Sequence, residues 1–333
     1  MRYLELSQSE LESRAQQAYE VYRECQICPH GCGVDRTQGQ TGYCGQTDLL
    51  RVSSSIQHFG EEPPLVGTRG VGNLFVTSCN MRCDYCQNFQ ISQLWKKPID
   101  SVAIEQSYRS IAQQMIRLQE EGVHFIGWVS PSHVVPGLLK SLCIAREIGL
   151  KIPIIYNTNA YDSVATLKLL DGVIDIYLPD LKYAYSSTAK EISHVNEYPE
   201  FSRQAVLEMY RQVGPLTLDE NGLAKQGLLI RHLLLPEDLA GTWDTLCFIA
   251  LELSSSVPLS LMSQYRPVHQ AMKKSSLNRV ITPEEYEKAI AMAKDLGIEN
   301  LYLQSMQMAA HNLPDFNNLD NPFPLDCTHN NIA

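Results

Sequence analysis

The sequence predicts an α/β protein in which a parallel sheet with helical crossovers follows a small cysteine-rich module. Two observations lead to this prediction. From about residue 69 onward, short apolar runs alternate with helix-length segments, as repeated βα units do. The chain before that point combines one short helical pattern with closely spaced glycines and cysteines. The length of 333 residues suits one barrel-sized domain or two smaller ones.

Six or seven apolar, β-branched runs predict the strands. In chain order they cover residues 73–77, 124–129, 152–157, 173–178, 228–235, 258–262 and, as a seventh, 300–304. This number of successive βα units favours a partial (β/α)6 barrel, similar to an incomplete TIM barrel. A doubly wound open sheet is the alternative, because the order of segments along the chain does not show closure. In both architectures ligands bind at the carboxyl ends of the strands, so functional residues are expected there.

Two helices have clear sequence signals. Apolar residues recur every three or four positions on one face of a helix that ends near Gly122, namely Ile104, Tyr108, Ile111, Met115 and Leu118. Thr282 to Glu285 form a capping box with proline at the first helical position, which predicts a helix that ends before Gly297. The predicted units are therefore an N-terminal module (1–68), the partial barrel (69–310) and a C-terminal tail (311–333) that is expected to lie on the surface without regular structure.

The charge and hydropathy patterns exclude two classes of partner. Twenty-seven basic and 37 acidic residues give a net charge of −10, which argues against binding the phosphate backbone of a nucleic acid. No apolar run approaches the roughly 20 residues that a membrane span needs. The first twenty residues are polar, with no apolar signal-peptide core, so we expect a protein of the reducing cytoplasm.

The ten cysteines are unevenly placed. Seven of them lie between residues 25 and 86, whereas Cys143, Cys247 and Cys327 are scattered and are expected to be packing or tail residues. Disulfides are a poor explanation for clustered cysteines in a cytoplasmic protein. The clustering therefore predicts metal binding.

Three cysteines directly follow the first strand of the predicted barrel. Cys79, Cys83 and Cys86 lie in the segment SCNMRCDYCQN, residues 78–88. A tight loop lets three thiolates bind one face of a four-iron, four-sulfur cube, so that one iron has no protein ligand. An open coordination position is typical of catalytic metal centres. Tyr85, just before the third cysteine, is expected to cover the cluster or to pack against an adenine.

Zinc is the alternative metal for this loop, with His58 or His124 as a fourth ligand. Zinc sites with several thiolates usually space their cysteines as CxxC pairs, unlike the CxxxCxxC spacing here, and they need no preceding strand. The iron–sulfur interpretation is therefore favoured.

A second group contains Cys25, Cys28, Cys32 and Cys44. Four thiolates form a closed ligand set, which suits tetrahedral zinc or a second iron–sulfur cluster without an open iron. Neighbouring glycines and a proline allow the tight turns that such convergence needs. The sequence favours zinc slightly, since no visible feature tunes an electron relay, and it leaves open that these cysteines bind nothing.

The CxxxCxxC spacing with an aromatic residue before the last cysteine resembles the radical S-adenosylmethionine (radical SAM) superfamily. Similar blocks extend along most of the chain and match the pyruvate formate-lyase activating enzyme-like branch, in the subgroup with cysteines ahead of the core: residues 60–92, 156–163, 177–183, 230–236 and 261–269. In that superfamily the amino and carboxylate groups of SAM chelate the open iron of a [4Fe–4S] cluster. One-electron reduction then yields methionine and a 5′-deoxyadenosyl radical.

The resemblance implies roles for several residues near strand ends. Asp180 and Lys182 would reach SAM, with Lys182 near its carboxylate, and Arg231 would point into the barrel. Asn157 and Asn159 would bind ribose or a peptide backbone, although Asn in a turn usually bonds its own main chain. His269 would bind a ribose or adenine. These residue types suit those ligands, because an ammonium pairs with a carboxylate and an amide both donates and accepts hydrogen bonds.

One segment departs from the superfamily pattern. Many members carry Gly-Gly-Glu after the second strand, where it holds the ammonium of SAM, but residues 130–133 here read Ser-Pro-Ser-His. The Ser130 hydroxyl and backbone carbonyls are expected to replace it, since an ammonium needs only acceptors.

The resemblance also implies an oxidoreductase-type activity: abstraction of hydrogen from a backbone glycine, which activates a glycyl-radical enzyme. A one-electron reductant such as flavodoxin or ferredoxin would drive it. Two alternatives remain open at this point. The same radical chemistry could act on a small molecule or another peptide, and a two-site zinc protein could act as a binding module without catalysis.

Overall fold

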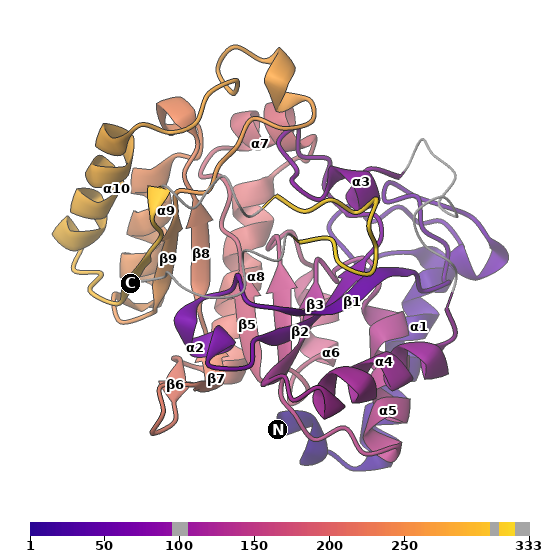
Figure 1. Ribbon diagram of the computed structural model, residues 1–333. Helices are drawn as coiled ribbons and strands as arrows, with labels where there is room; N and C mark the ends of the chain where they lie inside the picture. The colour runs from indigo at the N-terminus through magenta and orange to yellow at the C-terminus, as the bar shows by residue number, and fades with distance from the viewer. Residues whose placement is uncertain (95–105, 307–312, 324–333) are drawn as a thin grey trace.

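The computed structural model describes residues 1–94, 106–306 and 313–323 as a mixed α/β fold with mostly parallel sheets (Figure 1). Ile104 and Cys327, to which the sequence assigned roles, lie outside the described residues. Within the described ranges, none of the helices combines the length and the apolar character that a membrane span requires.

The strands form two sheets. They are β1 (Val52–His58), β2 (Val71–Val76), β3 (Phe125–Val129), β4 (Ile154–Thr158), β5 (Ile176–Pro179), β6 (Thr217–Leu218), β7 (Ala224–Leu228), β8 (Ile230–Leu233), β9 (Leu259–Met262) and β10 (Leu301–Leu303). The orders in the two sheets are β1-β2-β3-β4-β5-β7-β6 and β8-β9-β10. Parallel pairing runs from β2 to β5 and from β8 to β10. Each of the seven predicted apolar runs overlaps one or two of these strands.

The two sheets meet at β5, β7 and β8. Ile176 of β5 pairs with Gly227 of β7, and Asp180, just after β5, pairs in parallel with Arg231 of β8. Among the parallel strands the order does not reverse as it does in a doubly wound sheet. Among the described residues β1 and β10 are not paired with each other.

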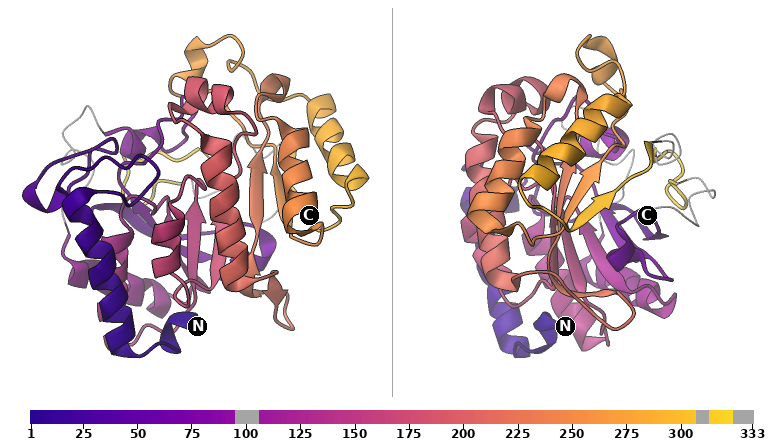
Figure 2. Two further views of the ribbon diagram at one scale, coloured as in Figure 1. Left: turned by 180° about the vertical axis from the view of Figure 1, so that it is seen from behind. Right: turned by 90° about the vertical axis from the view of Figure 1, so that its left-hand side faces the viewer.

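Helices cover the outer face of the sheet (Figure 2). They are α1 (Gln8–Glu20), α2 (Pro63–Val66), α3 (Phe89–Ser92), α4 (Tyr108–Glu120), α5 (Val135–Glu147), α6 (Val164–Leu169), α7 (Ser186–Ser193), α8 (Tyr198–Val213), α9 (Thr242–Phe248) and α10 (Pro283–Asp295). Both predicted helices are present as α4 and α10. In α10 the side chains of Thr282 and Glu285 form the predicted capping box, with the Glu285 backbone N–H donating to Thr282 Oγ1 over 3.2 Å.

The chain before residue 69 contributes to the same sheet. β1, which the sequence did not predict, pairs antiparallel with β2, and α1 packs against α5. Three of the seven residues of β1 are serines, two of them buried, so its pattern lacks the apolar alternation of an ordinary strand. The domain boundaries themselves stay predictions.

The described part of the tail, residues 313–323 (the C-terminal segment), is anchored rather than only draped over the surface. Phe316 is 2% exposed and packs against Phe75, with 5.4 Å between ring centroids. The Phe316 backbone N–H donates to Gln90 Oε1 over 2.8 Å, and Ser54 Oγ donates to the Leu319 carbonyl over 2.7 Å. The segment therefore lies between α3 and β1, as the yellow trace in Figure 1 shows.

Candidate functional site

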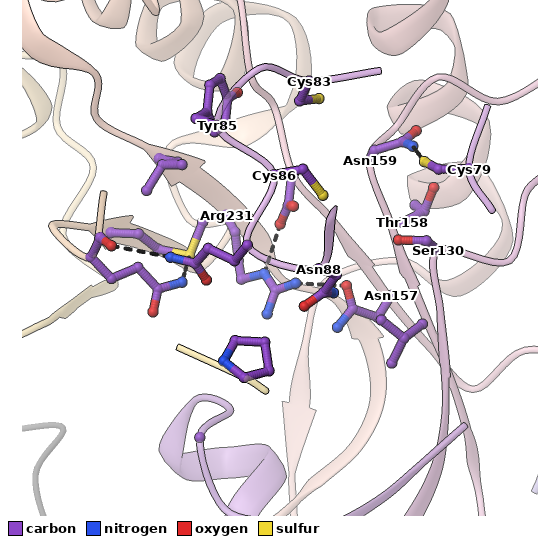
Figure 3. Close-up of a pocket in the computed structure, with 18 of the residues that line it drawn as sticks. Cys79, Cys83, Tyr85, Cys86, Asn88, Ser130, Asn157, Thr158, Asn159 and Arg231 are labelled. Atoms are coloured by element: carbon purple, nitrogen blue, oxygen red, sulfur yellow. Dashed lines mark hydrogen bonds and ion pairs between the residues drawn. The ribbon is translucent and has the colours of Figure 1, made fainter. Parts of the chain in front are cut away.

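A cavity of about 220 Å³ lies at the carboxyl ends of the parallel strands. Ten of the eleven residues that the sequence assigned to the catalytic centre line it: Cys79, Cys83, Tyr85, Cys86, Ser130, Asn157, Asn159, Asp180, Lys182 and Arg231. All of these except Asp180 and Lys182 are labelled in Figure 3. They come from β2 through β5 and from β8, or from the loops that follow these strands. The topology thus places them at the edge where α/β folds bind ligands.

The cysteine loop, residues 78–88, leaves β2 at a sharp turn and is fixed from the far side by α7. Ser78 has a positive φ of 64°. The backbone N–H groups of Arg82 and Asp84 donate to the carbonyls of Ser193 and Ile192 over 3.1 and 2.9 Å. These bonds hold the loop against an element about 110 residues away in sequence.

Two of the loop sulfurs accept hydrogen bonds from other parts of the barrel. Cys79 Sγ accepts from the Asn159 side-chain amide over 3.4 Å and from the Met81 backbone N–H over 3.4 Å. Cys83 Sγ accepts from Ser193 Oγ over 2.9 Å. Donors aimed at sulfur favour a thiolate, the form in which cysteine binds metal.

The third sulfur has a similar environment. Cys86 Sγ lies 3.1 Å from Ser92 Oγ, and the Asn88 backbone also bonds to it. Figure 3 shows the sulfurs of Cys79, Cys83 and Cys86 facing the space between them.

Burial makes the free thiols weak acids. It raises the pKa of Cys79 to about 12 and that of Cys83 to about 11, and it also raises the pKa of Cys86. Metal binding must therefore displace protons here, after which the hydrogen-bond donors stabilise the thiolates.

Three thiolates at one cavity suit a four-iron cube. In a four-iron cube each thiolate binds its own iron, so the sulfurs stand farther apart than around one ion. His124 precedes β3, at the opposite end of the strands from the loop, which removes it as a zinc ligand there.

Arg231 is the centre of a charged network on the cavity wall. Its Nε donates to Asp180 Oδ1 over 2.8 Å, one terminal nitrogen to Glu61 Oε2 over 2.9 Å, and the other to Asn157 Oδ1 over 2.6 Å. Lys182 Nζ donates to the second oxygen of Asp180 over 2.8 Å. Arg231 therefore points into the cavity, as the sequence predicted.

The network keeps its members ionised although they are buried. Burial alone would raise the pKa of Asp180, but Arg231 and Lys182 outweigh burial and hold the pKa below its ordinary value. Burial alone would lower the pKa of Lys182, but Asp180 and the Cys83 thiolate raise it. Lys182 thus remains a cation next to the cysteine loop.

Tyr85 is fixed against the cavity wall. Its hydroxyl accepts a hydrogen bond from Tyr183 over 2.9 Å, and its ring meets the edge of Tyr265 with 5.6 Å between centroids. Tyr183 also lies 2.5 Å from Ser193 Oγ, the donor to Cys83. Tyr85 is thus connected with Cys83 through the hydroxyl groups of Tyr183 and Ser193.

One predicted residue differs from expectation in its surroundings. His269 is not among the residues that line the cavity; its ring stacks on Phe89 with 5.0 Å between centroids. Tyr265 and Arg266, from the same segment after β9, line the cavity instead. Ser130 lines the cavity with a positive φ of 53°, and its N–H donates to the Asn157 carbonyl over 2.8 Å.

Glu61 and Ser193, which contact predicted site residues, were not assigned from sequence, and Asn159 makes a contact that was not expected. Asn159 binds Cys79, and its side-chain oxygen also accepts from the Tyr161 N–H, as an Asn in a turn usually does. Glu61 lies in the block 60–92 that carried the resemblance, so the sequence could have indicated it as a site residue. Ser193 had no such signal, because the sequence around it contains no motif.

No family model matches the chain. It is 29% identical over 296 residues to the "Uncharacterized protein MJ0674" of Methanocaldococcus jannaschii. The matched region covers 88% of this chain and 80% of that protein. The chain is also 28% identical over 160 residues to the "Uncharacterized protein MJ0808" of the same organism, covering 44% and 46%. Neither name states an activity.

Three solved structures resemble it in outline. HydG, a maturase of the [FeFe]-hydrogenase, matches with a TM-score of 0.46 and 11% identity, covering 90% of this chain and 63% of HydG. Streptococcus suis SuiB bound to precursor peptide SuiA matches at 0.45 and 11%, covering 70% and 48%. Methylornithine synthase (PylB) matches at 0.44 and 12%, covering 90% and 75%. The chain thus spans less than two thirds of HydG and SuiB, and TM-scores below 0.5 say nothing about what it binds.

Proposed function

We propose that this chain is a radical SAM enzyme. The observation that carries the proposal is the joint placement of Cys79, Cys83 and Cys86, with hydrogen bonds to their sulfurs, and of the buried cation Lys182 at one cavity. The three thiolates would hold a [4Fe–4S] cluster whose open iron faces the cavity. When bound, the cluster supplies the electron that cleaves SAM to methionine and a 5′-deoxyadenosyl radical.

The protein residues have separable tasks in this proposal. Lys182 offers an ammonium to the SAM carboxylate, and Asp180 fixes its direction through the 2.8 Å ion pair. Arg231 holds Asp180 from the other side and orients the Asn157 amide toward the cavity. Ser130 is the hydroxyl available for the SAM ammonium.

The first candidate substrate is a backbone glycine of a glycyl-radical enzyme, which the sequence resemblance suggests. A small molecule or another peptide is the second candidate, and one observation favours it. Pro314 and Phe323 of the C-terminal segment line the cavity, so this segment narrows the approach of a folded protein.

Anaerobic reconstitution with iron and sulfide, followed by reduction in the presence of SAM, tests the proposal. We expect iron–sulfur absorbance and release of 5′-deoxyadenosine. Cys83→Ala should abolish both, because two thiolates cannot hold the cube. Cys247→Ala is the matched control, since Cys247 lies in α9, outside the cavity.

Absence of iron uptake and of deoxyadenosine in the unmodified chain would refute the radical SAM proposal and leave the zinc binding module. Electron paramagnetic resonance on mixtures with candidate glycyl-radical proteins separates the two substrates. A doublet on a partner glycine identifies the first candidate. Deoxyadenosine formation without such a signal, but with a modified small molecule or peptide, identifies the second.

A further inference from the structure

A second group of thiols lies beside the cysteine loop. Cys25, Cys28, Cys32 and Cys44, here called the cysteine quartet, lie in one loop-rich segment after α1. Cys25 and Cys28 are buried, and Cys32 and Cys44 are half-buried. Hydrogen bonds fold this segment back on itself, since the Gly33 N–H donates to the Cys25 carbonyl over 3.0 Å and the Tyr43 N–H donates to Cys32 Sγ over 3.3 Å.

Every sulfur of the quartet has its own hydrogen-bond donor. The Tyr43 N–H donates to Cys32 Sγ over 3.3 Å, and a terminal guanidinium nitrogen of Arg36 lies 4.0 Å from Cys25 Sγ. The backbones of two further residues bond to the remaining sulfurs, His30 to Cys28 and Gln46 to Cys44. Hydrogen-bond donors at all four sulfurs favour thiolates, the form in which cysteine binds metal.

Arg36 provides an independent observation. Its side chain is buried, with 1% of the residue exposed, and its guanidinium lies over the Tyr22 ring at 3.9 Å. It donates to the carbonyls of Thr47 and His133, over 3.0 and 2.7 Å. Among the described residues no carboxylate lies within ion-pair distance of Arg36. A buried cation needs an anion nearby, and the quartet supplies one only when it is deprotonated, as in a metal-bound state.

The quartet touches the cysteine loop through two pairs of residues. His30, between Cys28 and Cys32, has its Nε2 2.8 Å from the carbonyl of Asn80, the residue after Cys79. Arg82, between Cys79 and Cys83, donates to the Tyr43 carbonyl over 2.7 Å and lies 3.8 Å over the Tyr43 ring.

The two pairs are also stacked on each other. The rings of His30 and Tyr43 are nearly parallel, with 3.7 Å between centroids. Asn80, the acceptor from His30, is also bonded to Asn159, which donates to Cys79. A route with one hydrogen bond, from Cys28 through His30 to Asn80, therefore connects the two thiol groups.

The surroundings of the quartet suit an electron-transfer cluster, because the His30 ring connects it with the cysteine loop through the Asn80 carbonyl. Cys32 lies between Gly31 and Gly33, both exposed, so the quartet has a side that an external protein can approach. A hydrogen bond on each sulfur and partial exposure are features that set the potential of an iron–sulfur cluster.

We infer that the cysteine quartet holds a second iron–sulfur cluster, which passes electrons to the cysteine loop through the contact of His30 with Asn80. Each transfer oxidises the quartet cluster by one electron and reduces the loop cluster by one. An external one-electron donor of the ferredoxin or flavodoxin class, docking near Cys32, then reduces the quartet cluster again. The direction of transfer rests on the proposed function, whereas the presence of the second cluster does not.

Metal analysis of the anaerobically reconstituted chain tests the cluster. We expect about eight irons and eight sulfides per chain and no zinc. Cys28→Ser combined with Cys32→Ser should leave about four irons, with the loop cluster intact. About four irons together with one zinc in the unmodified chain would overturn the inference, and so would about four irons and no other metal.

A His30→Ala variant tests the electron route. It removes the contact with Asn80 and the stack on Tyr43, and we expect reduction of the loop cluster by reduced ferredoxin to slow about tenfold. Reduction by dithionite, which reaches the loop cluster directly, should change little. Tyr43→Phe is the matched control, because it keeps the stacked ring and loses only the hydroxyl bond to the His194 carbonyl.

The readouts separate this inference from the proposed function. Paramagnetic resonance of the doubly reduced chain should show coupling between two clusters, and this coupling does not require SAM. Eight irons without deoxyadenosine would refute the radical SAM proposal and keep the second cluster. If His30→Ala has its full iron content and ferredoxin reduces its loop cluster as fast as in wild type, the route is refuted.

Discussion

Replacing Asp180 by asparagine tests the charged network on the cavity wall. One oxygen of the Asp180 carboxylate bonds to Lys182 and the other to Arg231, each over 2.8 Å. The side chains are 17%, 13% and 12% exposed, so solvent screens these charges only weakly. Asparagine keeps the shape and removes the charge.

The expected loss follows from these contacts. Removing one partner of a buried ion pair costs about 3–5 kcal/mol, because the other charge stays buried. Here Glu61 still pairs with Arg231, and the asparagine oxygen can accept one hydrogen bond, but its NH₂ group must face a cation. We therefore expect the free energy of unfolding to fall by about 3 kcal/mol, at the lower end of that range.

The loss should depend on pH in a defined direction. The pKa of Asp180 is lowered in the folded chain, so its contribution is fully present above the unfolded value of about 3.9. It disappears as the pH falls through the lower, folded value. The difference between wild type and Asp180→Asn should therefore be largest near pH 7 and shrink below about pH 4.

Urea unfolding of the metal-free chain under reducing conditions measures this difference. Asp320→Asn is the control, because Asp320 is exposed and should change stability by no more than about 0.5 kcal/mol. A double-mutant cycle with Lys182→Met should give a coupling energy of about 1–3 kcal/mol. A loss in Asp180→Asn as small as in the control, with no coupling to Lys182, would refute the network.

Three further predictions test other parts of the structure. Thr282→Ala removes the side-chain cap of α10 and should lower the free energy of unfolding by about 1 kcal/mol in urea; an unchanged midpoint would contradict the cap. Ser193→Ala removes the hydroxyl that donates to Cys83 and should make the loop cluster harder to reduce, which a redox titration followed by paramagnetic resonance would show; an unchanged potential would disprove this contact's role. Phe316→Ala should speed hydrogen exchange and proteolysis in residues 313–323 without a matching loss of global stability, because the segment can detach locally; protection equal to wild type would contradict its anchoring by Phe316.

Most of the strands that the sequence predicted share one property: their residues are buried on both faces, with β10 as an exception. β2 and β3 have no exposed positions, so their runs are continuously apolar and easy to recognise. β1 lies at the edge of the sheet and reads VSSSIQH, which has no such run. The anchoring of Phe316 was equally hidden, because its partner Phe75 is about 240 residues away.

The candidate site also contains residues that the sequence reveals and residues that it does not. Cys79, Cys83, Asp180 and Lys182 stand out because their residue types and spacing carry the chemistry. Ser193 does not, since its role depends on α7 folding back over the cysteine loop. Local patterns predict ligands, whereas the groups that tune those ligands come from long-range packing.

The departure at residues 130–133 has a structural explanation. The His133 ring lies 2.8 Å from the Thr77 carbonyl, at the end of β2, and its own carbonyl accepts from Arg36 over 2.7 Å and from the Tyr22 hydroxyl over 3.3 Å. Burial lowers the pKa of His133 to about 4, so the ring is neutral at pH 7 and can donate to that carbonyl. His133 thus connects the strand that precedes the cysteine loop with the buried cation beside the cysteine quartet.

A Gly-Gly-Glu turn at this place would lack that connection. Glycine has no side chain to reach Thr77, so the hydrogen bond of the His133 ring would be lost. The residue after β3 that remains free to face the cavity is Ser130, which leaves its hydroxyl and the neighbouring carbonyls as the acceptors for an ammonium.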